Sequence, residues 1–150
     1  MIKSNWQNIL IMVILLAGSL WWFSQKKLIK ENNLKINNQT VTIEVVKSVK
    51  DMAKGLSGRE SLCSDCGMLF AYADYHVRQF WMKDMNFALD IVWIKDDVIV
   101  GFAENIQTFD AQGEITRITS NEAVNLVLEL NAGWIGQNNV KIGDKVAGID

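Results

Sequence analysis

The chain has 150 residues, of which 49% are hydrophobic, and a formal net charge of −2 at pH 7. This length suits one globular domain with a short accessory segment. Residues 1–30 hold four lysines and no acid, which leaves residues 31–150 with 11 of the 15 basic residues, all 17 acids and a net charge of −6. Because an acidic domain is repelled by phosphate backbones, we exclude nucleic acid as a partner.

The N-terminal segment contains a long apolar run without charged residues. Residues 6–23 form an uncharged run of 18 residues, which as a helix would be about 27 Å long, close to the roughly 30 Å hydrocarbon core of a membrane. Trp6 at one end and Trp21 and Trp22 at the other are typical of interfacial anchors. A buried helix and a cleaved signal peptide are the alternatives. We predict a transmembrane signal anchor in residues 1–25, with membrane contact through residues 6–23.

The sidedness of this anchor is ambiguous, because lysines flank it on both sides. Lys3 precedes the span and three lysines follow it within residues 26–30, a count that by itself places the domain in the cytoplasm. The cysteine pair described below favours an oxidising compartment. We therefore predict a single-pass membrane protein whose globular domain, residues 40–150, is extracytoplasmic and is joined to the anchor by a polar linker at residues 26–39.

The first half of the domain alternates strand and helix signals. Residues 41–48 place apolar side chains on one face and predict a strand. Ser48 with Asp51 three residues later forms a capping box, so a short helix is expected to run to Gly55. The same logic predicts a second helical turn at residues 57–60.

Strand signals dominate the rest. Four apolar runs predict strands, the last two joined by a turn at Asp96 and Asp97: residues 68–72, 77–83, 89–95 and 98–106. Residues 122–130 fit helix or strand equally well, and a short helix from Ala132 and a last strand near residues 141–146 follow. We predict an α+β fold in which the N-terminal transmembrane helix precedes a compact, mixed or antiparallel, barrel-like sheet with short helices.

Several separate motifs occur in a fixed order from residue 40 to the C-terminus. They are GLSGR at 55–59, the block GMLFAYADYHVRQFWMKDMNFALDIVWI at 67–94, VLEL at 127–130 with Gly133, and GDKV at 143–146. In this order they resemble the DUF192 family, also known as uncharacterised protein family 0127. The resemblance implies a strand at residues 122–130, a compact domain with no agreed reaction, and a protein of a kind that is often exported.

Two carboxylates stand in apolar strands, where acids are unusual. Asp90 lies in FALDIVWI, a strand with two apolar faces, and Glu129 lies in LVLEL. A buried carboxylate must find donors, find a cation or take up a proton. The candidate partners are Arg59 and Lys83, and all four residues fall at positions that match the family's motifs.

Two interpretations of these four residues remain open. In the structural interpretation, which we place first, Asp90 and Glu129 pair with Arg59, Lys83 or backbone N–H groups and fix the register of the sheet. In the functional one, the four converge at the mouth of a pocket that is walled by Trp81 or Trp93 and holds a small polar ligand. Ion-pair networks and functional sites perturb pKa values alike, so the sequence does not separate the two.

The cysteine pair Cys63 and Cys66 has the spacing of a redox motif. A strand signal follows it, whereas a reactive thiol usually lies at a helix N-terminus. A structural zinc site needs four ligands, and the chain offers two cysteines and His76, its one histidine, which we expect to be a solvated loop residue. We predict a structural disulfide first, a metal half-site second and a redox catalyst last.

The signal for catalysis is weak. Asp90 and Glu129 are the only candidates for a two-carboxylate mechanism, and no phosphate-binding loop or dinucleotide fingerprint occurs in the sequence. We predict a membrane-anchored envelope domain that binds an envelope protein or a small polar ligand without catalysis, and we expect no metal or cofactor. The alternatives are an envelope enzyme or ligand receptor that uses the four charged residues, and a thiol redox protein.

Overall fold

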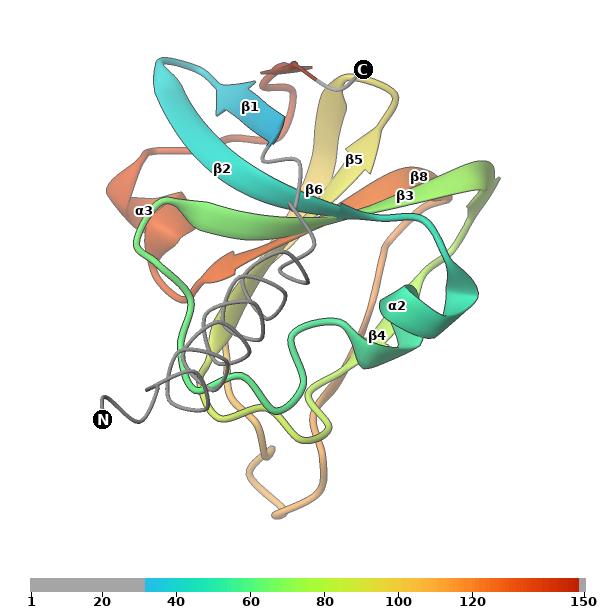
Figure 1. Ribbon diagram of the computed structural model, residues 1–150, viewed down its shortest axis with the longest axis vertical. Helices are drawn as coiled ribbons and strands as arrows, with labels where there is room; N and C mark the ends of the chain where they lie inside the picture. Colours follow the sequence, from blue (N-terminus) through green and yellow to red (C-terminus); the bar gives the residue numbers. More distant parts are fainter. Residues whose placement is uncertain (1–31, 149–150) are drawn as a thin grey trace, which may run out of the picture. The chain divides into compact units, whose positions relative to one another are not determined.

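The structure is a computed structural model that describes residues 32–148 of the chain (Figure 1). Nine strands and two short helices form within this range. Their bounds are β1 Asn32–Ile36, β2 Gln39–Val46, α2 Val49–Lys54, β3 Cys66–His76, β4 Gln79–Trp81, β5 Leu89–Lys95, β6 Val98–Ile106, β7 Arg117–Thr119, β8 Val124–Asn131, α3 Trp134–Gln137 and β9 Val146–Ala147.

Seven strands form one sheet in the order β6-β5-β8-β3-β2-β1-β9. The β2–β3 pair is parallel and the other pairs are antiparallel. The sheet curls into a half-barrel (Figure 1), and the segment just before β9 meets β6 where Ile99 donates a backbone hydrogen bond of 2.9 Å to Asp144. Strands β4 and β7 form a separate two-stranded ribbon.

Side chains alternate between the two faces of this sheet, and each face has its own apolar core. The first core is made by residues from all seven strands and by Trp134 and Ile135 of α3, so it fills the inside of the curl. The second core lies on the other face, over β3, β8 and β5, and includes side chains from the loop after α2 and from the segment between β4 and β5. Gly101, which pairs with Trp93 across β5 and β6, leaves room there for the indole, since a Cβ at this position would lie 3.2 Å from it.

The helix at residue 48 is confirmed with its predicted ends. The hydroxyl of Ser48 accepts a hydrogen bond of 3.1 Å from the backbone N–H of Asp51, and Gly55, at φ 50°, ends α2. The Asp96 turn between β5 and β6 is also confirmed, with Asp96 at φ 58°. Residues 57–60 form turns and no second helix.

The predicted α+β class is wrong, because the described part of the chain is mostly β-sheet. Its two helices have six and four residues and serve as inserts between strands. The capping signals mark where a helix begins but do not set its length, which Gly55 limits in α2. Two strands had no prediction: β1, which falls in the segment expected to be linker, and β7.

The predicted single-pass membrane localisation is likewise corrected. Within residues 32–148, no helix is long and apolar enough to cross a membrane. The expected anchor at residues 1–25 and its membrane contact at residues 6–23 lie outside the described residues.

Candidate functional site

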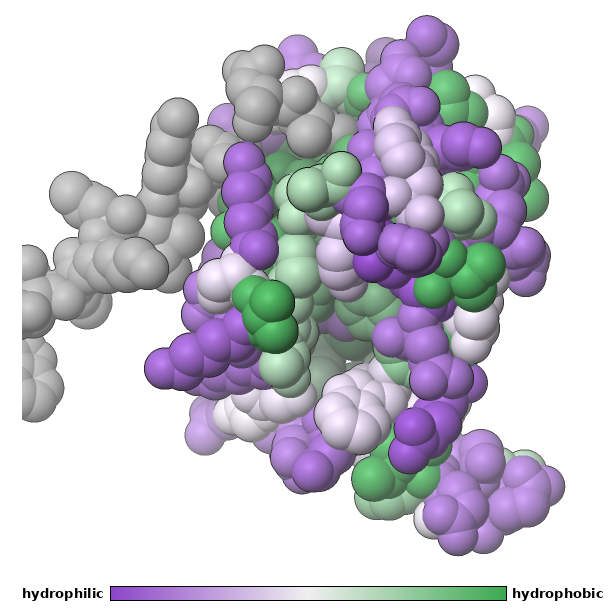
Figure 2. Space-filling view, turned by 90° about the vertical axis from the view of Figure 1, so that its right-hand side faces the viewer, coloured by the Kyte–Doolittle hydropathy of each residue, from purple (hydrophilic) through white to green (hydrophobic). Residues whose placement is uncertain are grey.

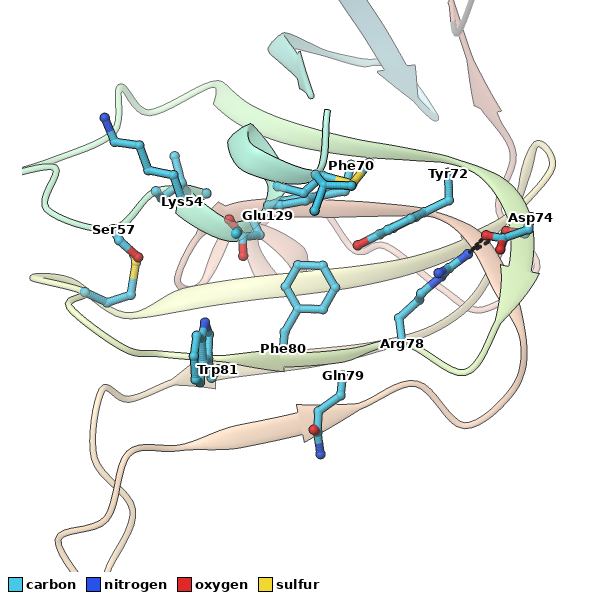
Figure 3. Close-up of a pocket in the computed structure, with 16 residues that line it drawn as sticks. Lys54, Ser57, Phe70, Tyr72, Asp74, Arg78, Gln79, Phe80, Trp81 and Glu129 are labelled. Carbon is cyan, nitrogen blue, oxygen red and sulfur yellow. Dashed lines mark hydrogen bonds and ion pairs between the residues drawn. The ribbon is translucent and has the colours of Figure 1, made fainter. Parts of the chain in front are cut away.

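A pocket of about 490 Å³ opens on the outer face of the sheet, between α2, the middle of β3 and the β4 strand. Figure 2 shows the hollow, with apolar and weakly polar surface inside and hydrophilic surface around it. Figure 3 shows the lining residues as sticks. They are Val49, Met52, Ala53, Lys54, Gly55, Leu56, Ser57, Phe70, Tyr72, Asp74, Arg78, Gln79, Phe80, Trp81, Met85 and Glu129.

The register of the sheet places Glu129 in this pocket. On β8, Glu129 pairs with Met68 of β3 on one side and with Ile91 of β5 on the other, and both neighbours belong to the second core. The end of α2 lies over it, since a Cβ built on Gly55 would be 3.9 Å from Glu129 Oε2. Glu129 is therefore 6% exposed, and its carboxyl group points into the pocket (Figure 3).

One oxygen of the Glu129 carboxyl group lacks a hydrogen-bond partner. Its Oε2 is buried and makes no hydrogen bond within the described residues. Burial raises the pKa of Glu129 to about 8, and the Arg59 guanidinium opposes this shift without cancelling it. Arg59 is instead engaged by Glu44 of β2, at 2.6 Å. Glu129 is consequently a mostly neutral acid at pH 7, able to donate a hydrogen bond as well as accept one.

Aromatic rings make the apolar walls. The rings of Phe70 and Phe80 meet edge to face, with centroids 4.9 Å apart. Phe80 also packs on Trp93 at 5.8 Å, so the wall is supported from the core behind it. Burial raises the pKa of Tyr72, and the Arg78 guanidinium, 3.7 Å from the centre of its ring, opposes that shift.

The charged groups around the pocket differ in how they are engaged. Arg78 donates to Asp74 at 2.5 Å (Figure 3) and to the backbone oxygen of Val124 at 3.2 Å, so this pair is internally satisfied. Trp81 is 48% exposed, and the cationic groups of Lys83 and Arg117 lie 5.5 and 5.6 Å from the centre of its ring.

Asp90 is fully buried but lies on the opposite face from Glu129. Its Oδ1 accepts hydrogen bonds from the backbone N–H groups of Asn105 at 2.8 Å and Gly133 at 3.1 Å, and its Oδ2 accepts one from Ile135 at 2.9 Å. Two of these donors belong to the start of α3, whose N-cap residue, Gly133, has no side chain to supply an acceptor. Asp90 thus stabilises α3 against the first core.

The structure therefore does not bring the four predicted charged residues together. Glu129 and Trp81 line the pocket, and Arg59 is near enough to affect the pKa of Glu129. Lys83 lies beside Trp81, outside the lining, and Trp93 is 3% exposed in the second core.

Sequence reasoning missed the aromatic wall on β3. Met68, Phe70 and Tyr72 are every second residue of β3 and therefore share one face of the strand, and Met68 is the residue that pairs with Glu129. The alternation was visible in the sequence, but the pairing of β3 with β8 was not. Once that register is known, Phe70 and Tyr72 follow as neighbours of Glu129.

The other candidates lie away from the pocket. Cys63 and Cys66 form a disulfide just before and at the start of β3. The Asn131 side chain holds the loop there by donating a hydrogen bond of 2.7 Å to the backbone oxygen of Cys63. His76 is exposed and lies 3.1 Å from Asp74. In residues 32–148, no group of three or more His, Cys, Asp or Glu side chains is arranged to hold a metal ion.

Two solved structures share this fold. A protein from Sinorhizobium meliloti 1021, described as a candidate transcription regulator, is 28% identical with a TM-score of 0.73, over 80% of this chain and 95% of its own. A protein of unknown function from Novosphingobium aromaticivorans DSM 12444 is 25% identical with a TM-score of 0.70, over 77% of this chain and 83% of its own. No protein with a curated description matches the chain. Residues 32–148 match the model of DUF192, "Uncharacterized ACR, COG1430", and the chain therefore belongs to the DUF192 family.

Proposed function

We propose that residues 32–148 form a small-molecule-binding domain whose pocket accepts a ligand with a hydrogen-bond acceptor aimed at Glu129. One observation carries this proposal: a buried carboxyl group with an unpartnered oxygen points into a pocket of about 490 Å³. An unmade hydrogen bond of a buried group costs roughly 1–3 kcal/mol. A ligand that completes this bond recovers that free energy.

The pocket has the size and chemistry of a ligand site. Its volume of about 490 Å³ falls within the roughly 300–1,000 Å³ typical of small-molecule pockets. Such pockets combine apolar walls with a few convergent polar groups. Here Phe70, Phe80 and Trp81 supply the walls, and Glu129 supplies the polar group at the bottom.

Binding without catalysis fits the lining better than hydrolysis does. Two-carboxylate hydrolysis needs a second available carboxylate within roughly 5–10 Å. Glu129 and Asp74 are the two acids in the lining, and Asp74 is held by Arg78 at 2.5 Å. Asp90, the other carboxylate considered from the sequence, faces the opposite core and is occupied by three backbone donors.

The test is a ligand-observed NMR screen of a fragment library against the full chain, with two variants. Glu129→Leu removes the carboxyl group from the pocket and puts an apolar side chain of similar size in its place. Glu114→Gln serves as the matched control, since it removes an exposed acid remote from the lining. We expect fragments that bind the wild type and the Glu114→Gln variant to lose binding in the Glu129→Leu variant. Equal binding to all three proteins would contradict the proposed function.

A further inference from the structure

Resting on that proposed function, we propose that the ligand is a small organic anion: a flat apolar body carrying a carboxylate or similar acidic head. The body would lie between the aromatic walls, and the head would accept a hydrogen bond from Glu129 at the bottom of the pocket. Three features support a negatively charged ligand. The acids of the lining carry no available negative charge, cations at the rim have no acidic partner among the described residues, and this positive rim is opposite in sign to the net charge of the domain.

The lining offers no available negative charge. Asp74 is neutralised by Arg78, and Glu129 is a mostly neutral acid at pH 7. The ionisable groups that face Glu129 are Arg59, from the loop after α2, and Tyr72, from β3. The neighbours on the other sides are Gly55, Met68 and Ile91, which carry no charge. A neutral acid among such neighbours can donate its proton to a ligand oxygen.

The rim carries cations without acidic partners. Lys54 lines the pocket, and Lys83 and Arg117 lie beside Trp81 at its edge. Within residues 32–148, none of the three takes part in a salt bridge. Figure 3 shows Lys54 at the edge with its amino group directed outward, where it acts on an approaching ligand through its field.

This local surplus of positive charge is opposite in sign to the domain as a whole, because residues 31–150 carry a net charge of −6. A positive rim on a negative surface draws anions toward the pocket. A cationic ligand would meet Lys54 in the lining, with Lys83 and Arg117 beside Trp81, and would find no free carboxylate there at pH 7.

Three probes of nearly equal shape test the charge: benzoate, benzamide and benzamidine. They share a planar ring and a planar head group and carry charges of −1, 0 and +1. Their dissociation constants for the full chain are measured by ligand-observed NMR at pH 6.5 and again at pH 9. We expect benzoate to bind most tightly at pH 6.5 and to weaken at pH 9, because Glu129, with its pKa of about 8, has then lost the proton that it donates.

A rim variant sharpens the result. In Lys54→Gln/Lys83→Gln, we expect benzoate to bind about two- to fivefold more weakly per charge removed, with the dissociation constant of benzamide unchanged. Lys141→Gln is the matched control, since Lys141 is exposed and remote from the pocket lining.

The outcomes separate failure of the anion proposal from failure of the proposed ligand site. Tightest binding by benzamidine, or benzamide as tight as benzoate with no effect of the rim variant, overturns the anion proposal and leaves the ligand site standing. Failure of all three probes at millimolar concentration, or binding that Glu129→Leu does not change, contradicts both proposals.

Discussion

The two buried carboxylates, Asp90 and Glu129, lie on adjacent strands and give the same signal in the sequence, but their surroundings differ completely. Asp90 accepts hydrogen bonds from three backbone N–H groups and joins β5 to α3. Glu129, on the opposite face of the sheet, has an oxygen with no partner and points into a pocket. An acid in an apolar strand is therefore a structural element when backbone donors reach it, and a candidate site when they do not.

The largest effect is expected from Asp90→Ala. It removes the acceptor of three backbone N–H groups, two of them at the start of α3, and leaves these donors buried. We expect the free energy of unfolding to fall by about 3–5 kcal/mol, measured by urea denaturation. Asp97→Ala, which removes an exposed acid paired with Lys145, is the control. A loss no larger than in that control would show that Asp90 is not a structural element.

The second prediction concerns pH. Burial raises the pKa of Glu129 in the folded state to about 8, above the ordinary value of 4.5 for a glutamate. Between these values the folded state holds a proton that the unfolded state has released, so stability is lost as pH rises through this window and is constant above it. Within the window the slope is about 1.4 kcal/mol per pH unit.

Urea denaturation at a series of pH values checks this slope. We expect the difference in unfolding free energy between the wild type and Glu129→Gln to change with pH by this slope, because glutamine does not titrate. Parallel stability curves for the two proteins would mean that the carboxylate ionises without a penalty in the folded state.

A third, smaller effect is expected from the disulfide. Replacing Cys63 and Cys66 by serine removes a short loop closure, which costs about 2 kcal/mol in the chain-entropy account. The pocket lies elsewhere, so binding of fragments is expected to persist. Calorimetry and the NMR screen measure the two properties separately. Loss of binding with an intact fold would show that the two cysteines do more than close this loop.

The smallest effect on stability is expected from Glu129→Gln at pH 4, which lies below the pKa of Glu129 in both the folded and the unfolded state. A neutral amide replaces a mostly neutral acid of nearly the same shape, so the unfolding free energy should change by less than about 1 kcal/mol. This is the direct counterpart of Asp90→Ala. A loss of several kcal/mol would indicate that Glu129 is ionised and paired, and the contrast between the two carboxylates would disappear.

Local signals gave much of this fold, and long-range pairing explains what they could not give. The cap at Ser48, the stop at Gly55 and the strand around Asp90 follow from residues within one or two turns of each other. The half-barrel depends on the parallel β2–β3 pair and on β8 lying between β3 and β5, which no short window of sequence contains.

The site was predicted in part for the same reason. Glu129 was selected as an acid in an apolar run and Trp81 as a possible wall of the pocket, and both line the pocket. The expected convergence of Asp90 with Glu129 does not occur, because the register pairs Ile91, not Asp90, with Glu129. Residues 90 and 91 project to opposite faces of the sheet, so one residue of register decides which side chains meet.

The most direct test of the account is an NMR titration of the Glu129 side-chain carboxyl carbon in the full chain, with the resonance assigned by its absence in Glu129→Gln. The account predicts a titration midpoint at about pH 8, as expected for a buried acid without a partner. A midpoint near 4.5, the ordinary pKa of a glutamate, would mean that the carboxylate is solvated or paired. Glu129 would then be a second structural acid like Asp90, and the central claim would be wrong.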